Sequence, residues 1–218
     1  GGADFEPRLA HFRRHGCGPA ALAQLGRRGN HYPRLVPEVA TEFHRIGEGD
    51  SITIGRRTFR VLTVLGHAPE HACLWDEAGR LLISGDQVLP KITTNVSVWS
   101  EQPRLNPLRL YLDSLHRFEP MAPDTMVLPS HGLPFRGLHE RLGHPRDHPP
   151  ARLNEALDAL VEPRSAAELV PVLFRRELDS HQLSFAMGEA LAHLRFLEDE
   201  GRAARVVDAD GVHRFRKA

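Results

Sequence analysis

The sequence reads LTVLGHAPEH at residues 62–71, LLISGD at residues 81–86 and TMVLPSHG at residues 125–132. In each segment an apolar run with the composition of a strand is followed at once by Gly or Pro and by a His or an Asp. Loops at strand ends are where a sheet protein holds its reactive side chains, because a rigid scaffold positions them. Imidazole and carboxylate groups together are the ligand set that suits zinc and its first-row neighbours.

The order of these three motifs resembles the second half of the metallo-β-lactamase superfamily, and in particular its hydroxyacylglutathione-hydrolase-like branch. The resemblance implies that His67 is a ligand of a first metal and that His131 is a ligand of a second metal. It also implies that the catalytic carboxylate of Asp86 bridges the two cations. Two zinc ions are the expected cofactors, with Mn2+ or Fe2+ as alternatives. The resemblance continues through residues 87–96 and into the C-terminal tail, so it covers nearly the whole chain.

One motif of the superfamily is missing from the sequence. The signature H-x-H-x-D-H, which normally lies upstream and supplies four more ligands, does not occur in it. The N-terminal stretch contains His11, His15 and His31, but no Asp in the right register. We therefore expect the chain to be a fragment that lacks the first β-sheet and most of the metal site. Such a fragment should be inactive, bind metal poorly and expose apolar surface.

The composition limits the classes of partner. The chain has 218 residues, which allows one or two domains, and 41% of them are hydrophobic, enough for a sizeable core. The 28 basic residues balance the 28 acidic ones, so overall charge draws the chain neither to nucleic acid nor to a membrane. Cys17 and Cys73 lie far apart, which favours two free thiols and a cytoplasmic location. No apolar run approaches the ~20 residues that span a bilayer.

The first 148 residues have the pattern of an α/β domain. Residues 52–54 and 58–65 predict one hairpin, and residues 72–76 and 80–83 predict a second. An amphipathic helix is predicted to run from Asn106-Pro107 to Phe118, ahead of a strand at 125–128. The resemblance implies that this domain, residues 1–148, is the C-terminal half of a metallo-β-lactamase αβ/βα sandwich.

Helices replace the strand signals at about Pro149. One helix is predicted at 151–161, a second opens with a capping box at Ser165 and runs to about Glu177, and a third opens at Ser184. Two short strands then flank the Asp210-Gly211 turn signal. Three helices and a hairpin predict a winged-helix domain over residues 149–218, which agrees with the resemblance. Three consecutive acidic residues on its third helix argue against nucleic-acid binding and favour packing or a homodimer.

Four further residues are candidates for substrate binding. Thr94 and Asn95 follow the bridging Asp86 and are expected to line the substrate cleft, with an ordinary polar loop as the alternative. Tyr32 is a candidate lid residue. His144 lies in a basic, His-rich segment that is either a domain linker or part of the site. His71, the second histidine of GHAPEH, is predicted to brace its loop and not to bind metal.

These observations predict a dinuclear metal hydrolase in the full-length protein. A metal-bound hydroxide would attack a small ester, thioester or lactone. The alternatives are an RNA- or phosphodiester-cleaving nuclease of the same fold, and a catalytically inert module. A cluster of Lys or Arg around the cleft would favour the phosphodiester.

Overall fold

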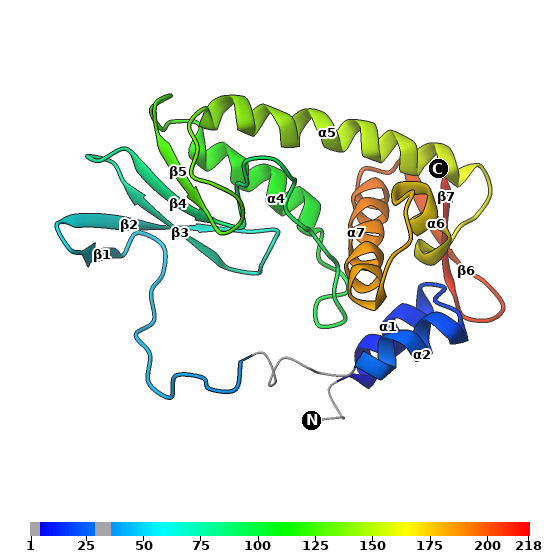
Figure 1. The fold of residues 1–218 in the computed structure, drawn as a ribbon. Helices are drawn as coiled ribbons and strands as arrows, with labels where there is room; N and C mark the ends of the chain where they lie inside the picture. Colours follow the sequence, from blue (N-terminus) through cyan, green and yellow to red (C-terminus); the bar gives the residue numbers. More distant parts are fainter. Residues whose placement is uncertain (1–4, 29–35) are drawn as a thin grey trace. The chain divides into compact units, whose positions relative to one another are not determined.

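A computed structural model describes residues 5–28 and 36–218, except for the side chains of residues 28 and 144–150. The chain divides into two compact units, each of which is described by itself (Figure 1). The sheet unit comprises His44–Val96 and Pro107–Pro150. The helical unit comprises the described part of Gly1–Phe43 together with Ser97–Asn106 and Ala151–Ala218.

The sheet unit is built on five strands in the order β1-β2-β3-β4-β5. The strands are β1 Ser51–Ile54, β2 Arg57–Val64, β3 His71–Asp76, β4 Leu81–Gly85 and β5 Met126–Pro129. The first four pair antiparallel through two hairpins, and β5 pairs parallel with β4. Both predicted hairpins and the predicted strand before His131 are confirmed, and the fold is the expected α/β class.

Helix α4 (Pro107–Leu115) packs on one face of this sheet and continues as a short 3-10 turn, η1 (His116–Phe118) (Figure 1). The sheet residues on that face are fully buried, as Leu62, Leu82 and Val127 illustrate. The backbone N–H of Leu65 donates to Ser114 Oγ of the helix at 2.9 Å. The predicted helix over 106–118 is therefore confirmed, and its apolar stripe covers the sheet.

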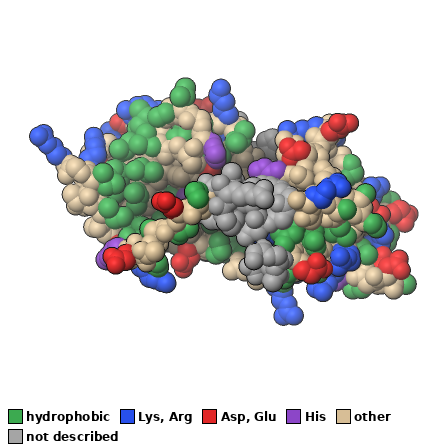
Figure 2. Space-filling view, turned by 60° about the horizontal axis from the view of Figure 1, so that its bottom comes forward, with side chains coloured by type: hydrophobic (Ala, Val, Ile, Leu, Met, Phe, Trp, Pro, Cys, Tyr) green, Lys and Arg blue, Asp and Glu red, His purple; other side chains and the backbone are tan. Residues whose placement is uncertain are grey.

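The opposite face of the sheet is also apolar. The strand register places on it the half-buried side chains of Leu74, Leu81, Ile83, Met126 and Leu128. Figure 2 shows hydrophobic side chains gathered on the sheet unit. A sheet that is apolar on both faces is typical of a layered α/β fold, in which both faces are covered. The five side chains are half-buried here and not fully exposed, so the expected exposure of apolar surface in a fragment stays a prediction.

The helical unit contains the N-terminal helices, the C-terminal helices and a two-stranded hairpin. Its elements are α1 Glu6–Arg14, α2 Pro19–Arg28, the end of α5 (Leu138–Asp158), η2 Ala159–Val161, α6 Ala166–Leu173, α7 Ser180–Asp199, β6 Ala203–Val207 and β7 His213–Lys217. Cys17 and Cys73, one in each unit, are buried free thiols. No helix in the described ranges is both long and apolar enough to cross a bilayer.

Three helix boundaries differ from the prediction. Helix α5 begins at Leu138 instead of 151, and its path includes three prolines, a residue type that usually ends or kinks a helix. Helix α6 ends at Leu173, before the predicted end near 177. Helix α7 begins at Ser180 instead of Ser184, because Asp179 and Gln182 form a capping box.

The grouping of the chain also differs from the simple division at 148/149. The sequence analysis placed residues 1–43 with the sheet, whereas their described part groups with the C-terminal helices. One backbone contact in the helical unit illustrates this: the Ala167 N–H donates to the His15 carbonyl at 3.1 Å. The two units meet in sequence at 150/151, inside α5. The domain limits 1–148 and 149–218 stay a prediction.

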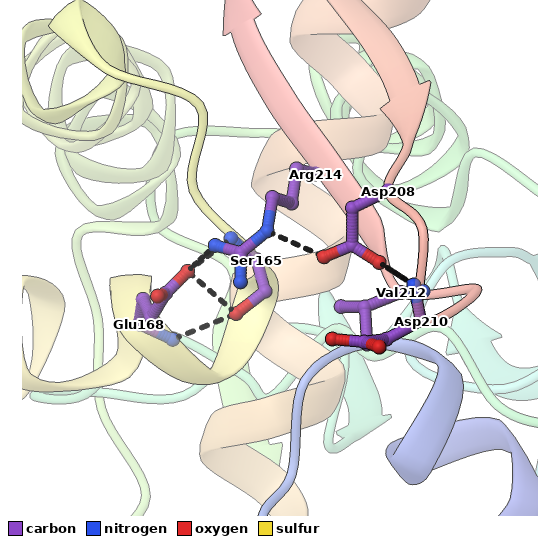
Figure 3. Close-up of polar contacts among 6 residues, drawn as sticks. All are labelled: Ser165, Glu168, Asp208, Asp210, Val212 and Arg214. Carbon is purple, nitrogen blue, oxygen red and sulfur yellow. Dashed lines mark hydrogen bonds and ion pairs between the residues drawn. The ribbon is translucent and has the colours of Figure 1, made fainter.

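An ion-pair network links the start of α6 to the C-terminal hairpin (Figure 3). Ser165 caps the helix in the predicted capping box with Glu168, which confirms that prediction. Arg214 of β7 donates to Glu168 Oε2 at 2.6 Å and to Asp208 Oδ2 at 2.8 Å. The other oxygen of Asp208 accepts from two N–H groups of its own turn, those of Asp210 and Val212. One guanidinium thus connects the helix cap to the hairpin turn.

Candidate metal centre

The sheet topology brings the three motif loops to one edge. Strand β2 ends at Val64, opposite the start of β3 at His71. Strands β4 and β5 run parallel and end together, with Gly85 in register with Pro129. The carboxyl ends of neighbouring parallel strands therefore deliver Asp86 and His131 to the same place, and the loop after β2 delivers His67.

The three predicted ligand side chains converge. His67 Nε2 lies 3.5 Å from Asp86 Oδ2, and His131 Nε2 lies 3.3 Å from Asp86 Oδ1. Each imidazole thus faces a different oxygen of one carboxylate. The side chains of His67 and Asp86 are each 29% exposed and that of His131 is 69% exposed, so all three can be reached from solvent.

His67 is oriented by two oxygens behind it. Its Nδ1 lies 2.9 Å from the Asn95 carbonyl and 3.1 Å from Thr94 Oγ1. A carbonyl oxygen only accepts, so this contact assigns the proton to Nδ1 and leaves the lone pair of Nε2 directed at Asp86. Metal-binding histidines are commonly held in this way, with the second ring nitrogen donating to a carbonyl.

Asp86 is held from two sides. Ser130 Oγ donates to Asp86 Oδ1 at 2.6 Å, and the Asp86 backbone N–H donates to His71 Nε2 at 3.2 Å. Gly85 adopts φ +53°, and a Cβ there would collide with the His71 ring. Burial, and then the neighbouring His67, lower the pKa of His71, so that ring stays neutral and can accept. These contacts agree with the predicted bracing role of His71.

The donor geometry fits a divalent cation on each side of Asp86. A lone pair that faces a carboxylate oxygen is unfavourable unless a proton or a cation lies between them. Two ligands at about 2.0–2.2 Å from a tetrahedral zinc ion are separated by about 3.3–3.5 Å, which is the separation found in both pairs. Each pair supplies only two donors, and no three His, Cys, Asp or Glu side chains in the described ranges form a metal-binding group.

The predicted substrate-binding residues have different outcomes. Thr94 is buried and directs its hydroxyl at His67, and the Asn95 carbonyl does the same. These contacts give both residues a part in orienting His67, while their contact with substrate stays a prediction. Tyr32 lies outside the described residues, as does the side chain of His144. Ser130 was not predicted as a site residue, although it stands inside the quoted PSHG motif.

The loops that follow Asp86 and His131 carry exposed apolar side chains. The loop after Asp86 meets the loop after His131 where Pro90 lies against Gly132, which adopts φ +86°. These loops expose Ile92 and Leu133. Arg141 holds the first loop by donating to the carbonyls of Leu89 and Ile92.

A second group of histidines lies in the helical unit. His11 of α1 and His15, which follows α1, are buried, and the His15 ring centroid lies 4.8 Å from that of His11 and 4.9 Å from that of His213. One ring nitrogen of each has no hydrogen-bond partner among the described residues. Burial, and then His11, lower the pKa of His15 to about 3. Among the residues that the structure describes, no carboxylate forms a metal-binding group with these rings, whereas Asp86 lies between His67 and His131.

The chain matches two families of known proteins. The family described as "Metallo-beta-lactamase superfamily" matches residues 10–131, and the family described as "Metallo-beta-lactamase-like, C-terminal domain" matches residues 153–218. The chain belongs to the metallo-beta-lactamase superfamily. Members of this superfamily generally bind divalent metals, often zinc, and metal-dependent hydrolysis is the activity that its relatives indicate.

Individual relatives agree. The chain is 30% identical over 159 residues to "Probable metallo-hydrolase YqjP" from Bacillus subtilis, a match that covers 71% of the chain and 49% of that protein. Among solved structures, a beta-lactamase domain protein from Burkholderia ambifaria matches with a TM-score of 0.90 and 53% identity, over 97% of this chain and 62% of that one. TTHA1429 from Thermus thermophilus matches with a TM-score of 0.79 and 28% identity, over 98% and 64%. The chain therefore spans about half the length of the curated relative it matches.

Proposed function

We propose that this chain supplies His67, Asp86 and His131 to the dinuclear zinc centre of a hydrolase in the hydroxyacylglutathione-hydrolase-like branch. The observation that carries the proposal is the position of the Asp86 carboxylate, which directs one oxygen at each imidazole, 3.5 Å and 3.3 Å away. The negative charge of Asp86 would offset the repulsion between two cations held on either side of it. Divalent cations at these positions would polarise a carbonyl oxygen and lower the pKa of bound water.

The remaining donors must come from elsewhere in the whole protein. Two donors per cation are fewer than the three or four that a protein zinc site normally has. We propose that an H-x-H-x-D-H segment of the whole protein supplies the others and that a further layer covers the apolar face of the sheet. The 218 residues alone are then expected to bind zinc weakly, and hydrolysis belongs to the whole protein.

The surroundings of the donors favour a small ester, thioester or lactone over a phosphodiester. Ile92 and Leu133 expose apolar surface on the loops that follow Asp86 and His131. The guanidinium groups of Arg141 and Arg136 are occupied by backbone carbonyls. Lys91 is the one cation in the loop 86–92. Phosphate recognition requires several available Lys or Arg side chains. Arg136, Arg141 and Lys91 do not form such an array.

The C-terminal region is proposed to act through packing. Three helices followed by a hairpin are consistent with the predicted winged helix over 149–218. Arg195 on α7 pairs with Glu198 and Asp199, and Arg205 pairs with the same Glu198. Because these cations are neutralised within the unit, they favour a homodimer contact or intramolecular packing over nucleic-acid binding.

Metal analysis combined with a substrate panel tests this proposal. The whole protein, purified without chelator, should contain two equivalents of zinc, Mn2+ or Fe2+ by plasma mass spectrometry. It should hydrolyse a thioester, ester or lactone in the panel, and a chelator should abolish the activity. If the protein hydrolysed only a phosphodiester, the substrate class would be phosphodiesters and not esters, thioesters or lactones. A metal-free protein that does not take up zinc would contradict the proposal.

A further inference from the structure

The sheet register fixes the backbone of Ser130 beside Asp86. Gly85 and Pro129 are in register at the ends of the parallel strands β4 and β5. The Ser130 N–H donates to the Gly85 carbonyl at 3.0 Å, which extends the pairing by one residue. Ser130 and Asp86 are therefore the first residues beyond the paired strand ends, and their side chains have a fixed backbone separation.

The Ser130 side chain uses this position to hold the carboxylate. Its hydroxyl donates to Asp86 Oδ1 at 2.6 Å, the short distance of a charge-assisted hydrogen bond. The same Oδ1 faces His131, and Oδ2 faces His67. Packing alone does not fix the carboxylate, because the Asp86 side chain is 29% exposed and the terminal torsion of aspartate has a broad preference.

We infer that Ser130 is a positioning residue for the proposed metal centre, on which this inference rests. By holding Oδ1, the hydroxyl sets the plane of the carboxylate so that each oxygen faces one imidazole. An ionised carboxylate oxygen has two lone pairs, so the oxygen that accepts from Ser130 keeps one for a cation. Loss of an outer-shell partner of this kind typically lowers metal affinity about 10–100-fold.

Two substitutions at this position and one elsewhere separate positioning from simple loop stability. Ser130→Ala removes the hydroxyl, and Ser130→Thr keeps it, with space for the added methyl because Ser130 is exposed. Ser100→Ala is the matched control. Ser100 Oγ also donates to a carboxylate, Glu101 Oε2 at 2.9 Å, but it does so in the helical unit.

Zinc affinity is measured on the whole protein by competition with a chelating dye. Ser130→Ala should weaken zinc binding about 10–100-fold while the metal-free melting temperature stays within the range of Ser100→Ala. Ser130→Thr should restore most of the affinity. Unchanged affinity in Ser130→Ala, or a loss in Ser130→Thr as large as that in Ser130→Ala, would overturn the inference.

A metal-free readout keeps this test separate from the proposed function. Crystal structures of metal-free wild type and Ser130→Ala should differ in the side-chain torsions of Asp86, with the carboxylate rotated away from His67 and His131 in the variant. An unrotated carboxylate in Ser130→Ala would overturn the positioning role. If wild type binds no zinc, the proposed metal centre fails, and the torsions of Asp86 still decide what Ser130 does.

Discussion

The chain carries two histidine groups that differ in what surrounds them. In the sheet unit, His67 and His131 lie on either side of the Asp86 carboxylate and are open to solvent. In the helical unit, His11 and His15 are buried and contact each other edge to face, and one ring nitrogen of each has no hydrogen-bond partner within the described part of the chain. The sequence has 14 histidines, and the number of histidines alone does not tell these two groups apart.

The two groups differ in how their imidazole rings are oriented and in the charges around them. His67 has a carbonyl behind one nitrogen and a carboxylate before the other, so its lone pair has a fixed direction. His15 has neighbours that oppose its protonation, namely His11, His213, Arg205 and Arg14. The group around Asp86 is suited to binding a cation. The buried group around His15 disfavours additional positive charge.

The largest expected effect comes from Asp86→Asn. Asn has nearly the same size but no charge, so the fold should survive while the second metal is lost or weakened first. In the whole protein, kcat should fall more than the roughly 100-fold upper range of an outer-shell change. Metal content by plasma mass spectrometry and steady-state kinetics check this.

The control for that variant is Asp124→Asn. Asp124 is an exposed carboxylate of the same unit that pairs with Arg80 at 2.5 Å, away from the three donors. It should keep both metals and near-normal turnover. If Asp86→Asn also keeps two metals and near-normal kcat, the distinction between the two histidine groups loses its chemical basis.

The second prediction concerns acid and the buried histidine group. The pKa of His15 is lowered from 6.5 to about 3 in the folded chain, so the unfolded chain binds the proton first as the pH falls. The contribution of neutral His15 to the free energy of unfolding is fully present above about pH 6.5. It should decrease at lower pH, by about 2 kcal/mol at about pH 5 for one such histidine. Burial lowers the pKa of His11 and His213 as well, which adds to the loss.

Urea unfolding over a pH series measures this loss. His15→Leu should flatten the decrease by up to about 1.4 kcal/mol per pH unit, because one proton fewer is taken up on unfolding. A free energy of unfolding that is the same at about pH 7 and about pH 5 would mean that these rings are hydrated or paired, and the contrast with the Asp86 site would weaken.

The third prediction sharpens the roles within the sheet unit. His71 accepts from the Asp86 N–H and fills the space over Gly85, so His71→Ala should lower the free energy of unfolding by about 1–3 kcal/mol. If His71 only braces its loop, as predicted, zinc content at saturating zinc should be unchanged. Loss of one full zinc equivalent with normal stability would instead make His71 a ligand.

The smallest expected effect lies in the helical unit, at the network of Figure 3. Arg214→Met removes two partly exposed ion pairs and should cost about 1 kcal/mol of stability, with no change in zinc content. Arg175→Met is the control, since Arg175 is 80% exposed and pairs with Glu155. Equal unfolding midpoints for the two variants would show that the network adds nothing beyond a surface pair.

Sequence patterns predicted the strands well because that signal is local. The choice of His67, Asp86 and His131 came from the order of three motifs and the family resemblance that they carry, because each motif alone is a weak signal. The start of α7 was missed although a signal existed, since Asp179 and Gln182 have the spacing of a capping box.

Other features depend on packing and could not be read from local patterns. The grouping of residues 1–43 with the C-terminal helices depends on contacts between distant segments, such as that of His15 with Ala167. The role of Ser130 depends on the β4–β5 register, which places it beside a residue 44 positions earlier. Thr94 and Asn95 were assigned to the cleft, and their contact with His67 Nδ1 emerges only from the folded loop.

The most direct test of the proposed metal centre is an anomalous difference map from crystals of the whole protein grown with zinc, with data collected on both sides of the zinc absorption edge. The account predicts two peaks, one between His67 Nε2 and Asp86 Oδ2 and one between His131 Nε2 and Asp86 Oδ1. It predicts no peak at His11, His15 and His213. Empty density around Asp86, or zinc bound at the buried histidine group instead, would contradict it.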